Sequence, residues 1–331
     1  MTLPLLICDD SALARKQLAK SLPGGWDISV SFASNGVEAL DAVRAGKGDL
    51  LFLDLNMPVM DGFEVLEEIR KQDLGCLVLV VSGDVQPEAK QRVLSLGALA
   101  FIQKPINTQV LAKILQDYGI ISSAQPQTAE ELARFNQELG LLDLMQETLN
   151  IAMGQAGKRL GELLNTYIHL PVPQVKQLSY HQLPGQLACK DLDSVSASSQ
   201  GFIGAGIAGE ALILLDDVCL SALAEVLSIS PTEEASGDLE VLTDVASLLA
   251  GACLKGFAEQ LDINFSLGHP VILGRQASLT EIFNIDKLAD QPLLAVEIEY
   301  ILPEQDVGFD LLLLFTQDSQ PALVERTGYL R

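Results

Sequence analysis

The chain has 331 residues, 44 of them acidic and 21 basic, which gives a formal net charge of −23. A surface this acidic argues against nucleic acid or an anionic membrane as a partner. The length predicts about two domains, and a hydrophobic content of 48% is enough for two cores. No basic segment precedes the first apolar run, so we expect neither a signal peptide nor a transmembrane span.

The cysteines indicate the redox environment. They are odd in number, scattered and set in apolar surroundings: Cys8, Cys76, Cys189, Cys219 and Cys253. This pattern is typical of buried free thiols rather than a disulfide framework. We therefore predict a cytoplasmic protein.

Apolar runs and amphipathic segments alternate through the first 120 residues. The runs lie at residues 3–8, 50–53, 77–81 and 98–102, and their lack of strict alternation predicts buried parallel strands. Segments with one apolar stripe lie at 12–22, 37–45, 62–71, 87–96 and 107–118, and Asn107 can cap the last. Five strand and helix pairs predict an α/β fold with a doubly wound sheet.

Charged residues follow the ends of these strands. Asp9 and Asp10 come after the first run, Asp54 after the second and Lys104 after the last. Because the C-terminal ends of parallel strands share one crevice, these side chains should meet. Three carboxylates held together repel unless a divalent cation lies among them. The sequence therefore predicts a phosphoryl-transfer site.

The order of motifs resembles the receiver domain of two-component response regulators, over about residues 1–121. The acidic pair is followed by LDLNMPVMDG with Asp54 at its centre, by VVSG with Ser82 and by FIQKP with Lys104. The resemblance implies that Asp54 accepts a phosphoryl group from a histidine kinase or another phosphodonor. It also implies Mg²⁺ as the cofactor, ligated by Asp10, Asp54 and the carbonyl of Asn56, with Asp9 acting through water.

The same resemblance assigns roles around the phosphoryl group. Lys104 would pair with the phosphoryl oxygens, and the hydroxyl of Ser82 would close on them. Phe101 resembles the aromatic switch of the family. The Lys104–Pro105 bond is the one that we expect to be cis.

A polar break follows Gly119. Residues 122–127 read SSAQPQ, and a capping box from Thr128 to Glu131 predicts the start of a helix. We predict a receiver domain at 1–121, a short linker at 122–137 and a second domain at 138–331. A flexible linker of this length would allow docking within one chain, whereas a helix would hold the halves apart.

The second half contains an internal repeat with a constant offset of 97 residues. The first copy is Asp143, Glu147, Asn150, Gly154 and Lys158, and the second is Glu240, Asp244, Ser247, Gly251 and Lys255. The spacing of four, three, four and four keeps each set on one side of a helix, and the opposite sides are apolar. Glycines within a helix cost stability, and close approach of another backbone would explain Gly154, Gly157 and Gly161. The alternative interpretation is an ordinary solvated helix face, with glycines that let neighbouring elements of the same domain pack.

This half resembles the CheC/CheX family of chemotaxis phosphatases. Asp143, Glu147, Asn150 and Pro173 match the signature of that family, and residues 201–215, 292–301 and 308–315 look like its strands. The resemblance implies an α+β domain whose duplicated repeat builds one sheet flanked by two long helices. It further implies that Glu147 pairs with the lysine of a phosphorylated receiver while Asn150 holds the attacking water.

The second copy departs from this signature. Asp244 is shorter than glutamate, and Ser247 lacks the amide of asparagine, so we expect a weak or silent second site. Closer docking with an active Asp and Ser is the alternative.

Two functions follow from these readings. The first is a phosphatase that hydrolyses the phosphoaspartate of a CheY-type receiver, or of Asp54 itself. The second is a phosphorylation-controlled binding module for signalling or flagellar-switch partners, without hydrolysis. The sequence leaves open cis or trans action, the cognate kinase, a homodimer, and whether phosphorylation of Asp54 activates or inhibits.

Overall fold

The computed structural model describes residues 2–121, 128, 141–187, 194–229, 237–283 and 292–327. The chain divides into two compact units, Met1–Glu147 and Thr148–Tyr329, and the boundary falls inside helix α7 (Leu141–Leu164). The predicted linker at 122–137 lies, apart from Thr128, outside the described residues. The predicted domain limits therefore stay a prediction.

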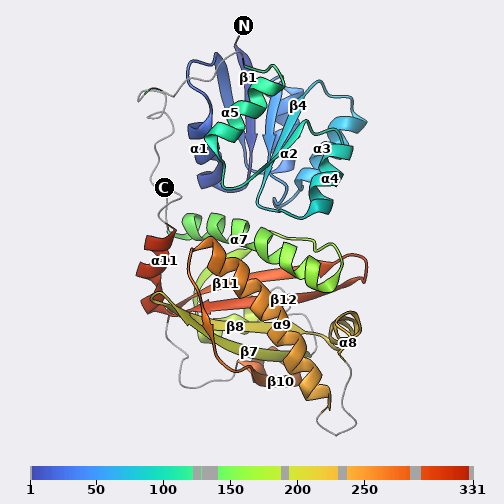
Figure 1. Ribbon diagram of the computed structural model, residues 1–331, viewed down its shortest axis with the longest axis vertical. Coiled ribbons are helices and arrows are strands. Elements are labelled where there is room, and N and C mark those ends of the chain that lie inside the picture. The colour runs from blue at the N-terminus through green and yellow to red at the C-terminus, as the bar shows by residue number, and fades with distance from the viewer. Residues whose placement is uncertain are drawn as a thin grey trace. The chain divides into compact units, whose positions relative to one another are not determined.

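The first unit has a parallel five-stranded sheet in the order β2-β1-β3-β4-β5, and helices lie on both of its faces (Figure 1). Its strands are β1 (Leu3–Cys8), β2 (Ile28–Ala33), β3 (Leu50–Leu53), β4 (Leu77–Ser82) and β5 (Ala100–Gln103). Its helices are α1 (Ala12–Ser21), α2 (Gly36–Arg44), α3 (Gly62–Lys71), α4 (Pro87–Ser95) and α5 (Thr108–Asp117). The predicted doubly wound α/β fold is confirmed, with element ends that differ by one or two residues.

Strand β2 is absent from the predicted apolar runs. Its sequence ISVSFA carries two serines, and only Ala33 is fully buried. The strand lies at the edge of the sheet, where it pairs with β1 alone. An edge strand needs less apolar surface than a central one, which is why its pattern is weak.

Local side chains fix where the helices of this unit begin. The Ser11 side chain accepts a hydrogen bond from the backbone of Ala14, and Asn107 caps α5 as predicted. Asp61 and Glu64 form a reciprocal capping box at the start of α3. Such caps satisfy backbone donors that the first turn leaves free.

The second unit has a seven-stranded antiparallel sheet, the 24-residue helix α9 (Gly237–Gln260) and the part of the 24-residue helix α7 that follows Glu147. The main path runs β10-β7-β8-β12-β11-β6, and β9 pairs with β7. The strands are β6 (Gln174–Ser179), β7 (Val195–Gly204), β8 (Ile207–Leu215), β9 (Ser266–Leu267), β10 (Val271–Ala277), β11 (Pro292–Leu302) and β12 (Val307–Phe315). Shorter segments are η1 (Tyr180–Gly185), α8 (Asp217–Val226), α10 (Leu279–Ile282), η3 (Gln317–Ser319) and α11 (Gln320–Arg326).

The duplicated repeat is visible in the order of these elements. Each copy runs from a long helix through a strand to a β-hairpin, and the second copy has the two-residue strand β9 in addition, so β6, β7 and β8 correspond to β10, β11 and β12. The first strand of each copy pairs with the hairpin of the other, because β6 joins β11 and β10 joins β7. The two copies therefore share one continuous sheet, as the α+β prediction required.

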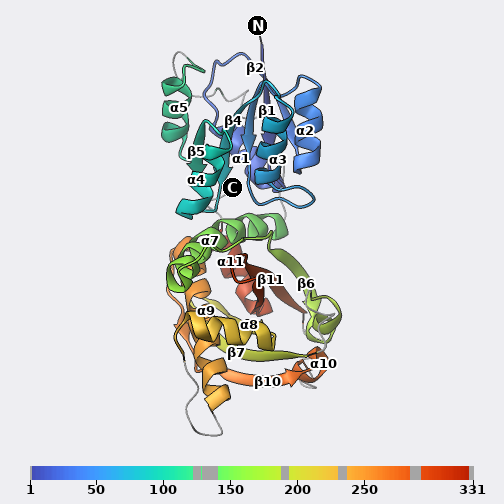
Figure 2. The same ribbon diagram turned by 90° about the vertical axis from the view of Figure 1, so that its right-hand side faces the viewer.

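Helices α7 and α9 pack on one face of this sheet (Figure 2). Their predicted apolar sides are buried: Met145, Leu149, Ala152, Ala156 and Leu160 in α7, and Leu242, Ala246, Leu249, Cys253 and Phe257 in α9. A Cβ atom on Gly256 would lie 2.7 Å from the backbone nitrogen of Ala156, so the two helices approach closely there.

At Gly157 the structure agrees with the alternative interpretation, in which glycine lets a neighbouring element of the same domain pack. A Cβ atom there would meet the side chain of Leu170, at 2.7 Å, rather than another backbone. A large side chain from the segment after the helix fills the space, and spacing within the helix gives no sign of it.

Within the described residues, Leu239–Gln260 is long and apolar enough to cross a membrane by length and composition, with a mean hydropathy of 1.5. The core helix of a soluble domain passes the same test, and 61% of this stretch is buried in the second unit. Among the cysteines of the described segments, Cys8, Cys219 and Cys253 are buried free thiols as predicted, whereas Cys76 is half-buried. Cys189 lies outside the described residues.

Candidate functional site

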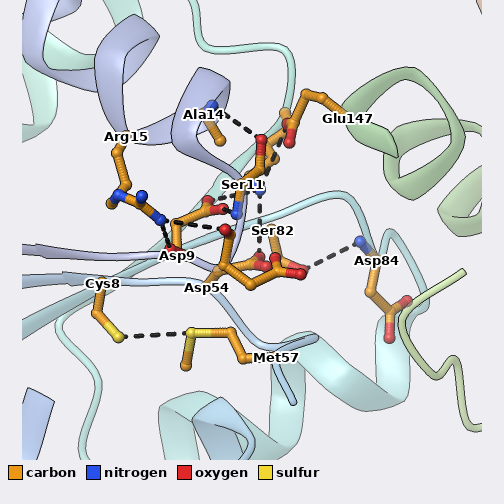
Figure 3. A network of polar contacts seen from close by, with 12 residues as sticks. Cys8, Asp9, Ser11, Ala14, Arg15, Asp54, Met57, Ser82, Asp84 and Glu147 are labelled. Carbon is orange, nitrogen blue, oxygen red and sulfur yellow. Dashed lines mark hydrogen bonds and ion pairs between the residues drawn. The ribbon is translucent and has the colours of Figure 1, made fainter. Parts of the chain in front are cut away.

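The C-terminal ends of β1, β3 and β5 bring the predicted charges of the first unit together, and Figure 3 shows Asp9 and Asp54 side by side. The Nζ atom of Lys104 lies 2.8 Å from Oδ2 of Asp9 and 3.5 Å from Oδ1 of Asp54. Carboxylate oxygens of Asp9, Asp10 and Asp54 lie within 4.8 Å of one another. Residues from three separate stretches of sequence thus form one acidic cluster with a lysine.

The cluster is electrostatically strained. Burial, together with the charges of Asp9 and Asp10, raises the pKa of Asp54 well above its usual range. Burial and the neighbouring Asp9 raise the pKa of Asp10 to about 7. Burial alone would lower the pKa of Lys104, but the Asp54 and Asp9 carboxylates outweigh it and raise that pKa instead. One ammonium group therefore does not balance three carboxylates.

The residues present fit a hard divalent cation. Mg²⁺ prefers carboxylate oxygens and is held through one or two protein carboxylates, and this cluster offers three. Among the described residues, the buried Oδ1 atom of Asp10 has no hydrogen-bond partner, so it retains a free lone pair. Asn56, whose carbonyl is the predicted further ligand, lies two residues after Asp54 in the loop that precedes α3.

The other predicted receiver residues lie around the cluster. Ser82 ends β4, and its Oγ accepts a hydrogen bond from the backbone of Asp84 at 3.1 Å. Phe101 is half-buried on β5. The Lys104–Pro105 peptide bond is cis, as predicted.

Three supporting residues were missed by the sequence reasoning. The backbone of Ser11 donates to Oδ1 of Asp9 at 2.9 Å. The Arg15 guanidinium donates to the carbonyl oxygens of Asp9 and Asp10, at 2.5 and 3.1 Å. A Cβ atom on Gly62 would lie 2.2 Å from the carbonyl oxygen of Asp54, so only glycine fits there. The Asp-Gly pair at 61 and 62 was the available signal for the last of these.

The predicted phosphatase residues belong to helix α7, in which the boundary between the two units falls. Glu147 and Asn150 are three residues apart and share one side of the helix with Asp143. Leu149 lies roughly 200° around the helix from Glu147, and Ala152 lies the same angle from Asn150. Leu149 and Ala152 line a small void between α7, α9 and the sheet. Neither amide atom of Asn150 has a hydrogen-bond partner in the described part of the chain.

The second copy occupies the matching place on α9. Asp244 and Lys255 are exposed, and Ser247 is half-buried. A Cβ atom on Gly251 would meet nothing within 4 Å. This side of α9 is therefore a polar surface, consistent with the predicted stripe.

Residues 5–116 match the family of response regulator receiver domains. The N-terminal part of this chain is therefore a response regulator receiver domain. The match does not extend to the second unit.

Individual relatives agree with this assignment. A protein-glutamate methylesterase/protein-glutamine glutaminase of Rhodospirillum rubrum is 37% identical over 140 residues, which are 41% of this chain and 36% of the relative. The chain thus spans about a third of that protein's length.

Two solved structures are also similar. A chain of the CheX–CheY–BeF3–Mg complex from Borrelia burgdorferi is 30% identical, with 34% of this chain and 87% of that chain covered and a TM-score of 0.31. Thermotoga maritima FliY is 18% identical, with 59% of this chain and all of that chain covered and a TM-score of 0.43.

Proposed function

We propose that this chain is a chemotaxis-type response regulator that is phosphorylated on Asp54, and that its second unit hydrolyses the phosphoaspartate of a receiver domain. The observation that carries the first half is the meeting of Asp9, Asp10, Asp54 and Lys104 at the strand ends of a receiver domain. The second half rests on the matched signature of Glu147 and Asn150 along one side of α7.

Phosphorylation would proceed by attack of an Asp54 oxygen on the phosphorus of a donor, either the phosphohistidine of a histidine kinase or a small acyl phosphate. The bond from phosphorus to the donor nitrogen or oxygen would break, and the imidazole or the carboxylate would leave. Bound Mg²⁺ would be held by Asp10, Asp54 and the carbonyl of Asn56, and would neutralise charge on the transferring group. Lys104 would leave its ion pair with Asp54 and pair with a phosphoryl oxygen. Ser82 would release the backbone N–H of Asp84 and turn its hydroxyl toward another phosphoryl oxygen.

Hydrolysis would use α7 as a rigid support. In the crevice of a phosphorylated CheY-type receiver, the Glu147 carboxylate would pair with the lysine of that receiver. The amide of Asn150 can donate and accept, so it can hold one water in line with the phosphorus and the leaving carboxylate. No covalent intermediate on α7 is needed, because positioning supplies most of the catalysis of phosphoryl transfer.

We infer that the stripe on α9 contributes little to hydrolysis. The Asp244 carboxylate ends one methylene earlier than that of glutamate. The Ser247 hydroxyl is too short to place a water where an asparagine amide would. The pair Asp244 and Ser247 therefore serves as a built-in comparison for the pair on α7.

The test is the decay of phosphoryl label on a separate CheY-type receiver that has been phosphorylated with acetyl phosphate. The Asp54→Ala chain, which cannot be phosphorylated itself, should accelerate this decay. Asn150→Ala should remove the acceleration, a loss of about 10² or more in rate. Ser247→Ala is the matched control. With this variant the label on the separate receiver should decay as fast as it does without the substitution.

The outcomes separate the two functions. Rates that are equal with and without Asn150 would overturn the phosphatase assignment. Binding of the phosphorylated receiver without any acceleration would favour the binding module. Labelling of the intact chain, compared with its Asp54→Ala variant, tests the phosphoacceptor independently of hydrolysis.

A further inference from the structure

The second unit contains a cavity of about 480 Å³ on the face of the sheet opposite α7 and α9. The same face carries a hydrophobic core of its own, in which Leu312 and Leu314 pack with Tyr180 of η1 and Phe283 after α10. The cavity continues this core toward the ends of β7, β8 and β12. All its described lining residues belong to the second unit.

The strand register shows how the floor of the cavity is built. Gly201 of β7 pairs with Glu210 of β8, which pairs in turn with Leu314 of β12. In the adjacent row, Ile203 pairs with Ala208. Residues opposite each other in a sheet project from the same face, so these five positions form one surface that includes the small residues Gly201 and Ala208.

Gly201 is the residue that keeps this floor open. It lies inside strand β7, its φ is not in the left-handed region, and a Cβ atom there would meet nothing within 4 Å. Glycine inside a strand costs stability, and it often marks a place where a ligand approaches closely. Neither backbone conformation nor packing against a described residue requires glycine here.

The charge at the cavity has one sign. Glu210 is exposed, and its carboxylate accepts a hydrogen bond from the hydroxyl of Ser199 at 3.1 Å. No ion pair within the described segments involves Glu210. Tyr180 is buried beside it, and its pKa is raised to about 12 by burial and by the charge of Glu210.

We propose that this cavity binds a small amphipathic cation, whose apolar body lies over Gly201 and Leu314 and whose amine pairs with Glu210. Clefts of this size with apolar walls and a few polar groups are typical of small-molecule sites. The carboxylate sets the preference for a cation. This site is independent of the proposed phosphatase activity, because it uses the face of the sheet opposite α7.

The test uses two probes with the same apolar body and opposite charge, 4-phenylbutylamine and 4-phenylbutyrate. Calorimetric titration into the full chain should show that the amine binds and that the acid binds at least about tenfold more weakly, a difference of about 1.4 kcal/mol. Glu210→Gln should bring the two affinities together. Gly201→Leu should abolish binding of both probes, because its side chain fills the floor.

Two control variants distinguish the cavity from the general acidity of the chain. Glu299→Gln removes an exposed strand carboxylate outside the cavity, and Gly251→Leu adds the same side chain on α9. Both should bind the amine like the parent chain. Gly201→Leu should also unfold no earlier than the parent, since it exchanges a strand glycine for an apolar residue in an open space.

Three results would overturn the proposal. The first is the absence of binding of either probe at millimolar concentration. The second is equal affinity of the parent chain for the amine and the acid. The third is a Gly201→Leu variant that folds and binds the amine as well as the parent.

Discussion

The ammonium group of Lys104 lies 2.8 Å from the carboxylate of Asp9 and 3.5 Å from that of Asp54, and its side chain is only 3% exposed. The two ion pairs bridge the ends of three strands. Because the surrounding carboxylates are buried, removing the cation leaves their charges without compensation. The lysine therefore has a structural effect in addition to its proposed role with phosphate.

We predict that Lys104→Met destabilises the first unit by about 3 to 5 kcal/mol, the usual cost of removing one partner of a buried ion pair. The double variant Lys104→Met, Asp9→Asn should be less destabilised than the sum of the single variants, because the uncompensated charge is removed as well. Urea unfolding in the absence of Mg²⁺ measures both. Lys71→Met, which breaks an exposed pair with Glu68, should leave the midpoint nearly unchanged.

Mg²⁺ should stabilise the chain through the same cluster. At a hundredfold excess over the dissociation constant, the gain is about 2.7 kcal/mol. Asp10→Asn should raise the melting temperature without Mg²⁺, because the raised pKa of Asp10 shows that its ionised form is disfavoured in the fold. The same variant should lose most of the further rise on addition of Mg²⁺.

Thermal unfolding with and without Mg²⁺ checks this prediction. Asp73→Asn removes an exposed carboxylate away from the cluster, and should keep the full response to Mg²⁺. An Asp10→Asn variant that responds to Mg²⁺ like the parent chain would exclude Asp10 as a ligand.

Arg15 should affect the metal site without contacting the metal. Its guanidinium holds the carbonyl oxygens of both Asp9 and Asp10, and so fixes the loop that carries the acidic pair. We predict that Arg15→Met weakens Mg²⁺ binding by about 10- to 100-fold, as removal of groups that orient ligands typically does. Arg15→Lys should recover little, because one ammonium group does not reproduce the planar fork.

Titration of Mg²⁺ by calorimetry measures this effect directly. Lys20→Met, in the last turn of the same helix, removes an equal charge and should leave the affinity unchanged. If Lys20→Met and Arg15→Met weaken binding equally, the effect is one of net charge and not of loop geometry.

The receiver half could be predicted closely because its chemistry constrains its sequence. A cluster of Asp9, Asp10, Asp54 and Lys104 requires those residue types at strand ends, and apolar runs mark the strands. Edge strand β2 was not predicted, because its serines leave little apolar signal. The supporting role of Arg15 was not predicted, because a single arginine on an amphipathic helix has no spacing that indicates which backbone carbonyl groups it binds.

The fold class of the second half was predictable, but the pairing of its strands was not. The constant offset of 97 residues indicated two copies, and helical spacing located their polar sides. Strands β6 and β10 each pair with the hairpin of the other copy. Strands β6 and β11 lie more than 100 residues apart in the sequence, and no local pattern encodes such a pairing. Strand β6 also has only half-buried or exposed residues.

Two glycines in helix α9 provide a matched test of the packing between α7 and α9. A Cβ atom on Gly251 would meet nothing within 4 Å, whereas one on Gly256 would lie 2.7 Å from the backbone nitrogen of Ala156. Gly251→Ala should therefore stabilise the chain by about 1 kcal/mol through helix propensity alone. Gly256→Ala gains the same propensity, but it must push the helices apart, and we expect a net loss of about 1 to 3 kcal/mol. Chemical denaturation of the two variants gives opposite signs if the helices pack as described, and equal gains would contradict the close approach at Ala156.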